Sequence, residues 1–252
     1  MPTLRVLNIF EAIYNSKKGL TLTEISHNTG IAKGTLHPII TTLVKKEYLE
    51  NTGTVISIGK SAFKLGYAYA HSLSYLYILK PHMREIVIAC DEICQLGVLD
   101  GNDVLYIEKT EPKQAIRIES SAGKTIKAYA TALGRCLLSD LSSKEIAALY
   151  PEGLSAYTAN TVTDKNTLLK ILSAVRQKGY AHEVGETNID IECIAVPIKI
   201  KNKIYAAISV SLPIFRSNPE KIMHIINVLQ FHQRAIETEI SALPDGIKLF
   251  SD

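Results

Sequence analysis

Residues 33–46 combine cationic, hydroxyl-bearing and small side chains in a pattern that suits nucleic-acid binding. At helical spacing, with no carboxylate before Glu47, one face carries Lys33, Gly34, Thr35, His37, Thr41, Thr42, Lys45 and Lys46. Lysines offset phosphate charge, hydroxyls bond to phosphates and base edges, and small residues allow close approach in a major groove. We therefore predict a DNA-reading helix with contacts from Lys33, Gly34, Thr35, His37, Thr41 and Lys45. A solvated helix face carries similar residues, so the surrounding elements have to support the prediction.

A second group of reactive side chains bears on whether the chain is an enzyme. Cys193 could be a nucleophile with His182 or His224 as its base. However, Cys193 lies within the strand-like run CIAVPI rather than at an exposed turn or a helix start, and no Asn or Asp completes the group. We therefore expect no enzymatic activity.

The four cysteines do not predict a metal site. They lack paired CxxC spacing, and Cys90 and Cys94 fit one helix face without a histidine or second cysteine pair to complete a zinc site. We expect reduced cysteines, no metal and no cofactor. No apolar run approaches the roughly 20 residues that span a bilayer, and the first residues lack the features of a signal peptide. These features favour a cytoplasmic protein without membrane contact.

Charge is distributed unevenly along the 252 residues, although the formal net charge is only +3. Residues 1–80 carry nine Lys and Arg against four Asp and Glu, whereas the remainder carries 19 against 21. A basic N-terminal third beside a slightly acidic body suggests that the first part meets a polyanion.

The elements around residues 33–46 have the order of a winged helix-turn-helix. Thr21 and Glu24 form a Thr-x-x-Glu capping box, and Gly30 ends the helix that this box opens. Residues 4–15 predict a supporting helix, and the turn signal at residues 51–53 predicts a short hairpin.

Residues 61–79 predict an aromatic helix with more apolar surface than a free linker exposes, which we interpret as a buried dimer seam. Pro81 is expected to end this helix, and residues 82–94 are expected to form the next one.

The remaining residues predict an α+β domain. Strand signals cover residues 95–101, 103–109, 115–120, 192–201 and 203–212, the last two joined by a turn at Lys201 and Asn202. Helix signals cover residues 131–139, 142–149, 164–178 and 219–241. Residues 242–252 are predicted to form a loose tail. Hairpin connections between the strands indicate an antiparallel sheet with helices packed on it.

The chain resembles the IclR family of bacterial transcriptional regulators over essentially its whole length. The motifs that carry the resemblance are, in chain order, LTLTEISHNTGIAKGTLHPIITTL, ISIGKSAFKLG, ATALGRCLL, GYAHEVGETNIDIECIAVPI and ISVSLP. The resemblance implies a winged helix-turn-helix over residues 1–60, a dimerising linker helix over residues 61–80 and a GAF-like effector-binding domain over residues 81–252. It also implies three partners: double-stranded operator DNA, a small carboxylic acid, and a second copy of the chain, with two dimers forming a tetramer.

The resemblance also nominates an effector site, floored by the C-terminal hairpin and closed by a helix start. The matching residues are Thr131, Ala132, Glu183, Ile191, Cys193, Ser209 and Ser211. Ser209 and Ser211 point to one strand face, and the helix start at residues 131–132 offers N–H groups to an anion. The alternatives are a buried apolar role for Cys193, a solvent-facing strand for the two serines and a surface position for Glu183.

Glu183 beside an anionic ligand would be costly unless it is protonated or bonds a ligand hydroxyl, which favours a hydroxy- or oxo-acid. Arg135 is an alternative charge partner for the acid, or else an ordinary solvated residue.

Three residues depart from what family members often carry. Pro38 replaces an Arg, and because proline lacks an N–H, we predict that the helix begins near Thr35 or kinks. Tyr129 replaces a His, and Asp190 replaces a Gly, both near the expected effector site. The identity of the ligand therefore cannot be carried over from the family.

We predict a DNA-binding transcriptional regulator, a repressor in preference to an activator, that is controlled by a small organic acid. The alternative is a ligand-binding interaction module without DNA binding, supported by Pro38 and by the few basic residues in the hairpin.

Overall fold

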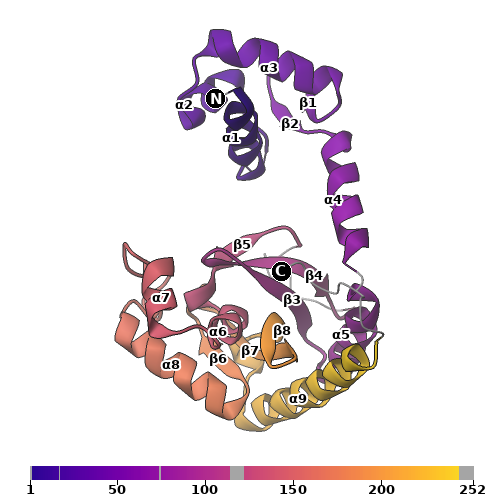
Figure 1. The fold of residues 1–252 in the computed structure, drawn as a ribbon, viewed down its shortest axis with the longest axis vertical. Coiled ribbons are helices and arrows are strands. Elements are labelled where there is room, and N and C mark those ends of the chain that lie inside the picture. Colours follow the sequence, from indigo (N-terminus) through magenta and orange to yellow (C-terminus); the bar gives the residue numbers. More distant parts are fainter. Residues whose placement is uncertain (1, 17, 74, 114–121, 244–252) are drawn as a thin grey trace. The chain divides into compact units, whose positions relative to one another are not determined.

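The computed structural model describes residues 2–16, 18–73, 75–113 and 122–243 of the chain. The chain divides into two compact units, Met1–Leu73 and Ser74–Asp252 (Figure 1). Each unit has a hydrophobic core. The three-part functional division at residues 60 and 80 stays a prediction. Among the described helices, none combines the length and the apolar character that crossing a bilayer requires.

The first unit is a winged helix-turn-helix. Its elements are α1 (Pro2–Tyr14), α2 (Leu22–Thr29), α3 (Lys33–Lys45), β1 (Leu49–Asn51), β2 (Ile56–Ile58) and α4 (Lys60–Ser72). The two strands pair antiparallel around the predicted turn. The core is shared by the first three helices and the hairpin and comprises Ile9, Ile13, Ile25, Leu36, Ile40, Leu49 and Ile56.

Local signals fix the turn between α2 and α3 as the sequence predicts. The Thr21 hydroxyl accepts the Glu24 N–H, and the Glu24 carboxylate accepts the Thr21 N–H at 2.7 Å, which completes the capping box. Gly30 ends α2 with a φ of 67°, a left-handed conformation that glycine adopts without steric cost. The start of α3 is therefore held close to the end of α2.

The single helix predicted over residues 61–79 is wrong, because two helices occupy this part of the chain. The first, α4, ends at Ser72, and the second, α5, spans Leu76–Cys90. Pro81 does not end a helix but lies inside α5, where the carbonyl that lacks its N–H belongs to exposed Tyr77. Water can satisfy a carbonyl on that side, so the cost of the proline is small enough for packing to offset. The helix expected over residues 82–94 accordingly begins earlier and ends earlier.

The second unit is a six-stranded antiparallel sheet with helices on both faces. Its strands are β3 (Ile93–Asp100), β4 (Asp103–Thr110), β5 (Thr125–Lys127), β6 (Ala181–Val184), β7 (Ile191–Ile200) and β8 (Lys203–Pro213), in the spatial order β5-β4-β3-β8-β7-β6. Its helices besides α5 are the short η1 (Ala128–Ala130) and η2 (Ile214–Arg216), with α6 (Ala132–Leu138), α7 (Ser143–Leu149), α8 (Lys165–Lys178) and α9 (Pro219–Ser241). The arrangement confirms the predicted α+β class.

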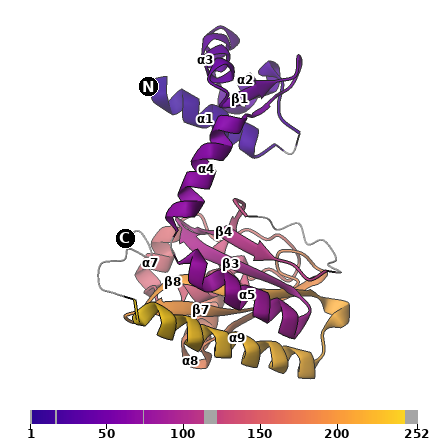
Figure 2. The ribbon, with the colours of Figure 1, turned by 90° about the vertical axis from the view of Figure 1, so that its right-hand side faces the viewer.

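The helices divide between the two faces of the sheet. The pair α5 and α9 packs on one face, and α6 covers the other with α8 behind it (Figures 1 and 2). The face beneath α6 is lined by small residues at Ala181, Ala195 and Ala207. These small side chains allow helix α6 to pack closely on the strands.

The order of strands and helices after residue 94 largely follows the sequence signals. The β7–β8 hairpin turns at Lys201 and Asn202, both at positive φ, and α8 runs from its Asp164 cap to Gly179. The strand predicted over residues 115–120 lies outside the described residues. The sequence does not predict strands β5 and β6, and Cys94 lies in strand β3 rather than sharing a helix face with Cys90.

Candidate functional sites

The outer face of α3 carries the residues predicted to read DNA, which we call the α3 face: Lys33, Gly34, Thr35, His37, Thr41 and Lys45. All are exposed except Thr35, which is half-buried. Among the described residues, no hydrogen bond or ion pair engages the side chains of Lys33, His37, Thr41 or Lys45. Thr42, by contrast, donates its hydroxyl to the Pro38 carbonyl at 2.8 Å. The α3 face therefore offers donors to a partner, whereas Thr42 is already engaged.

The sequence predicts that this helix begins late or kinks. The late start is wrong, because α3 begins at Lys33 and continues through Pro38 to Lys45. The kink stays a prediction. Pro38 and Gly34 are both exposed, so the Gly34 carbonyl that lacks an intrahelical partner faces solvent. The position of the proline on the outer side thus explains how one continuous helix tolerates it.

The first carboxylate after the α3 face is neutralised locally. The Glu47 carboxylate lies 2.6 Å from the Lys60 ammonium group, and this hydrogen bond lowers the pKa of Glu47. Lys60 begins α4 rather than lying in the hairpin turn, so it is not a free phosphate contact from the wing.

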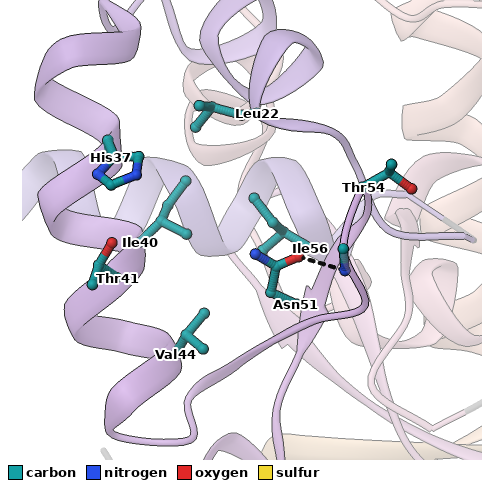
Figure 3. Close-up of a pocket in the computed structure, with 9 residues that line it drawn as sticks. Leu22, His37, Ile40, Thr41, Val44, Asn51, Thr54 and Ile56 are labelled. Carbon is teal, nitrogen blue, oxygen red and sulfur yellow. Dashed lines mark hydrogen bonds between the residues drawn. The ribbon is translucent and has the colours of Figure 1, made fainter.

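A cleft of about 350 Å³ separates α3 from the β1–β2 hairpin (Figure 3). His37 and Thr41 line its α3 side, and Asn51 and Thr54 line the hairpin side. Asn51 holds the turn by accepting the Gly53 N–H at 3.0 Å. Two residues of the α3 face, His37 and Thr41, therefore border a cleft whose opposite wall is the β1–β2 hairpin.

In the second unit, the sheet register gathers polar residues beneath α6, which we call the polar cluster: Gln95, Glu183, Cys193, Ser209 and Ser211. Glu183 pairs with Cys193, and Cys193 pairs with Ser211, across β6, β7 and β8. The Cys193 sulfur lies 3.0 Å from the Ser211 hydroxyl, which donates to the side-chain amide oxygen of Gln95 at 3.0 Å. The predicted Ser209 lies in the adjacent row opposite Gln95, and both serines are buried rather than solvent-facing. Gln95 was missed because its strand pairs with β8 across more than 100 residues.

Glu183 is a buried carboxyl, which excludes the surface position considered for it. Burial is the main cause that raises its pKa, and the Glu186 carboxylate also raises it, whereas the hydrogen bonds from the Glu186 N–H at 3.1 Å and from Cys193, with the charge of Arg135, lower it. The net result is a pKa of about 7. A carboxyl with this pKa exchanges its proton near neutral pH, so it can donate a hydrogen bond as well as accept one.

Arg135 is also buried, with 2% of its surface exposed, so the alternative of an ordinary solvated residue is wrong. It donates to the Glu186 carboxylate at 2.6 Å and to the Tyr129 carbonyl at 3.0 Å. The same Glu186 oxygen accepts the Val162 N–H. Arg135 is therefore matched inside the protein by Glu186, a residue that the sequence did not single out.

Helix α6 starts above the polar cluster. The Thr131 hydroxyl caps the helix by accepting the Gly134 N–H at 2.9 Å. A Cβ on residue 134 would lie 2.1 Å from the Ala128 carbonyl oxygen, so this position needs glycine. Ala132 and Cys193 pack in the same core cluster, and Ile191 lies on the strand face of Cys193. The fold thus places all seven predicted effector residues on or above one sheet face.

The two family departures in this unit differ in position. Tyr129 is buried, stacks edge-on against Tyr150 and donates its hydroxyl to the Ser155 carbonyl at 2.5 Å. Asp190 is exposed in the turn before β7, where its carbonyl accepts the Ile214 N–H. Tyr129 therefore alters the interior beneath α6, whereas the Asp190 side chain faces solvent.

The arrangement excludes the nucleophile–base pairs considered for Cys193. His182 points to the opposite side of β6 from Glu183 and bonds Glu192 at 2.6 Å. His224 lies on α9 and contacts the Ala89 carbonyl. Burial raises the pKa of the Cys193 thiol well above its ordinary value, so a reactive thiolate is disfavoured.

Family comparisons agree with this architecture. Residues 3–53 match the family described as IclR helix-turn-helix domain, and residues 67–238 match that described as Bacterial transcriptional regulator IclR C-terminal. The chain belongs to the IclR family. Its members are DNA-binding transcriptional regulators and not enzymes.

Individual relatives share about a quarter to a third of their residues with this IclR-family chain. It is 31% identical to the HTH-type transcriptional regulator KipR of Bacillus subtilis, over 83% of each protein. It is 27% identical to the transcriptional repressor IclR of Escherichia coli, over 86% of this chain and 82% of that protein.

The fold also matches a solved IclR homolog complexed with 4-hydroxybenzoate from Microbacterium hydrocarbonoxydans. The TM-score is 0.84 at 22% identity, covering 96% of this chain and all of that one (100%). At this identity the likeness is one of fold.

Proposed function

We propose that this IclR-family protein is a repressor that binds operator DNA through the α3 face and releases it when a small organic acid binds at the polar cluster. The observation that carries the proposal is the α3 face itself, which is exposed, cationic and free of carboxylates. Such a face fits a major groove, with Lys33 and Lys45 at phosphates and His37 and Thr41 nearer the bases. A protein with this role acts in the cytoplasm, where the bacterial chromosome lies.

The proposed DNA-binding form is a symmetric dimer joined through α4, with two dimers forming a tetramer. No residue of α4 is buried, and its apolar side chains Phe63, Leu65, Tyr67 and Tyr69 are exposed. At helical spacing Phe63 and Tyr67 share one side of α4, and Leu65 and Tyr69 share another. Exposed apolar side chains on a helix favour association with a second copy. A dimer should read two half-sites about 34 Å apart or a multiple of that spacing.

The proposed ligand is a carboxylic acid that also bears a hydroxyl or oxo group. The polar cluster offers hydroxyl, amide and carboxyl groups, and its only acidic member, Glu183, exchanges its proton near neutral pH. A protonated Glu183 can donate to a ligand carboxylate, and an ionised one can accept from a ligand hydroxyl. The relative that was crystallised with 4-hydroxybenzoate, a hydroxyl-bearing acid, supports this class.

Fluorescence anisotropy with a labelled duplex from the protein's own upstream region tests the proposal. We expect specific binding at low salt that weakens steeply as salt rises, through counterion release. Adding 4-hydroxybenzoate, other hydroxy- and oxo-acids, and benzoate as the matched acid without a hydroxyl should show release only with the former group. Failure to prefer the upstream duplex over a scrambled one at low salt would contradict the DNA-binding role.

The alternative, an interaction module without DNA binding, has Pro38 in its favour. A double variant with Lys33→Ala and Thr35→Ala separates the two, beside Lys144→Ala as a matched change on the exposed face of α7. The repressor proposal expects loss of DNA binding in the double variant only. Anisotropy that shows no DNA binding by the wild type or by either variant would favour the alternative.

A further inference from the structure

Two histidines and two carboxylates meet where α5 packs against α9, on the sheet face opposite the polar cluster. The Nδ1 atoms of His82 and His232 lie 2.9 Å apart. Glu85 places a carboxylate oxygen 3.9 Å from Nδ1 of His232, and Glu239 places one 3.1 Å from Nε2 of His82. The residues come from two helices that lie side by side in both views (Figures 1 and 2).

The contact with Glu239 sets the proton on His82. An ionised carboxylate only accepts hydrogen bonds, so Nε2 of His82 carries the proton and its Nδ1 keeps a lone pair. That lone pair points at Nδ1 of His232, which is 6% exposed. A carboxylate oxygen of Glu85 approaches the same place. Acceptor atoms of all three residues thus lie within 4.8 Å of one another, either around one shared proton or around a cation.

We propose that His82, His232 and Glu85 bind one divalent transition-metal ion of the kind that prefers imidazole, with zinc as the first candidate. The distances of 2.9 and 3.9 Å bracket the separation of about 3.3 Å between ligand atoms in a tetrahedral site with bonds near 2.0 Å. Two imidazoles and one carboxylate leave a fourth position for water. Glu239 supplies the outer carboxylate that holds a ligating histidine in its tautomer.

The spacing of cysteines and histidines predicts no metal site, because the two histidines are 150 residues apart and only the α5–α9 packing joins them. A metal here would link the first helix of the second unit to the last. The proposal is independent of the proposed DNA-binding role, since it requires only residues of α5 and α9.

Zinc binding to untagged, full-length protein, first treated with EDTA and then desalted, tests the proposal. Competition with a chromophoric chelator should give one zinc per chain with a Kd of about 10 µM or tighter. Zinc in excess should raise Tm by about 5 °C or more relative to EDTA. X-ray absorption should show nitrogen and oxygen neighbours without sulfur.

Variants distinguish this site from other zinc ligands in the chain. His82→Ala should weaken binding more than 100-fold, Glu85→Gln at least 10-fold, and Glu239→Gln about 10-fold, the last through the tautomer. Glu85 is 67% exposed in its side chain, so its substitution should not impair folding. His224→Ala, on the exposed side of α9, is the matched control and should bind as the wild type does. The proposal would be overturned if the protein bound no zinc or if the zinc were coordinated by sulfur. It would also be overturned if His82→Ala and Glu85→Gln bound zinc as tightly as the wild type does.

Discussion

The α3 face and the polar cluster use similar chemical groups, but these groups are in different states before any ligand arrives. On the α3 face, His37, Thr41 and the lysines are exposed. In the polar cluster, Ser211 already bonds Gln95, and Glu183 already accepts the Glu186 N–H. The polar groups of the α3 face are solvated before a partner binds. Those of the polar cluster already have hydrogen bonds within the protein, which a ligand would have to replace.

Because of this difference, substitutions in the two regions should affect the binding affinity and the free energy of unfolding differently. An exposed side chain makes little contribution to folding, so its removal should weaken binding and leave the free energy of unfolding almost unchanged. A buried, paired group contributes to both, because removing its partner leaves an unsatisfied charge or donor in a low-dielectric interior. Substitutions of similar size in the two regions should therefore have different measured consequences.

The largest contrast should come from Arg135, whose guanidinium is buried against Glu186. Arg135→Ala leaves the Glu186 carboxylate without its cation, and we expect the free energy of unfolding to fall by about 3–5 kcal/mol in urea titrations. Lys33→Ala, on the α3 face, should change it by no more than about 0.5 kcal/mol. Comparable losses in the free energy of unfolding for both variants would contradict the contrast between the polar interior and the α3 face.

Two helical glycines give the next contrast. A Cβ at Gly134 would lie 2.1 Å from the Ala128 carbonyl oxygen, whereas one at Gly34 would meet nothing within 4 Å. Gly134→Ala should therefore lower the free energy of unfolding by about 3 kcal/mol. Gly34→Ala should raise it by about 0.5–1 kcal/mol, since alanine favours a helix. Thermal and urea unfolding of both variants measure these signs, and the same sign for both would contradict the packing argument.

Glu183 makes the stability of the second unit depend on pH. Its pKa is about 7 in the folded protein against an ordinary value of 4.5, because burial disfavours the charged form. The stabilisation is fully present below pH 4.5 and is lost as pH rises through about 7, since the folded state holds the proton more tightly. Glu183→Gln removes this dependence while keeping the shape of the side chain.

We expect Glu183→Gln to match the wild type near pH 4.5 and to exceed it increasingly towards pH 8, by up to about 3 kcal/mol. Urea unfolding at several pH values measures the difference. A constant offset between the two proteins across this range would show that Glu183 does not titrate as described.

The last contrast concerns DNA binding by a single cation of the α3 face. Lys33→Ala should weaken operator binding by about 1 kcal/mol and reduce the slope of log affinity against log salt by about 1, if Lys33 contacts one phosphate. Anisotropy titrations at several salt concentrations give both values, and Lys144→Ala supplies the control. An unchanged slope would remove Lys33 from the proposed contacts and sharpen the assignment of the remaining ones.

The winged helix-turn-helix was predictable because its signals are local. The bond between Thr21 and Glu24, the left-handed Gly30 and the turn around Gly53 each involve residues at most three apart. The short strands β5 and β6 were missed because three or four residues acquire strand geometry only by pairing with a neighbour. The prediction that Pro81 ends a helix is wrong because the free-energy cost of a proline inside a helix depends on whether the carbonyl four residues earlier faces water. The sequence alone does not show which way that carbonyl faces.

The effector residues nominated by family resemblance were placed on one side of the sheet, but their chemical environment was not predictable. The partner of Arg135 is 51 residues away, and the hydroxyl of Ser211 meets Gln95 from 116 residues away. The spacing of residues along the sequence does not predict contacts between residues so far apart in the chain. Burial also decides whether Glu183 is a surface anion or a carboxyl that holds its proton near neutrality.

By itself the sequence determined the α+β class, the order of most elements and the carboxylate-free face of α3, because capping, turn chemistry and helical spacing act over a few residues. Only the tertiary structure decided which polar groups are buried together: Glu186 with Arg135, Gln95 with Ser211, and His82 with His232. The physical reason is that strand register and helix packing bring distant residues into a dry interior, where each charge or donor must find a partner.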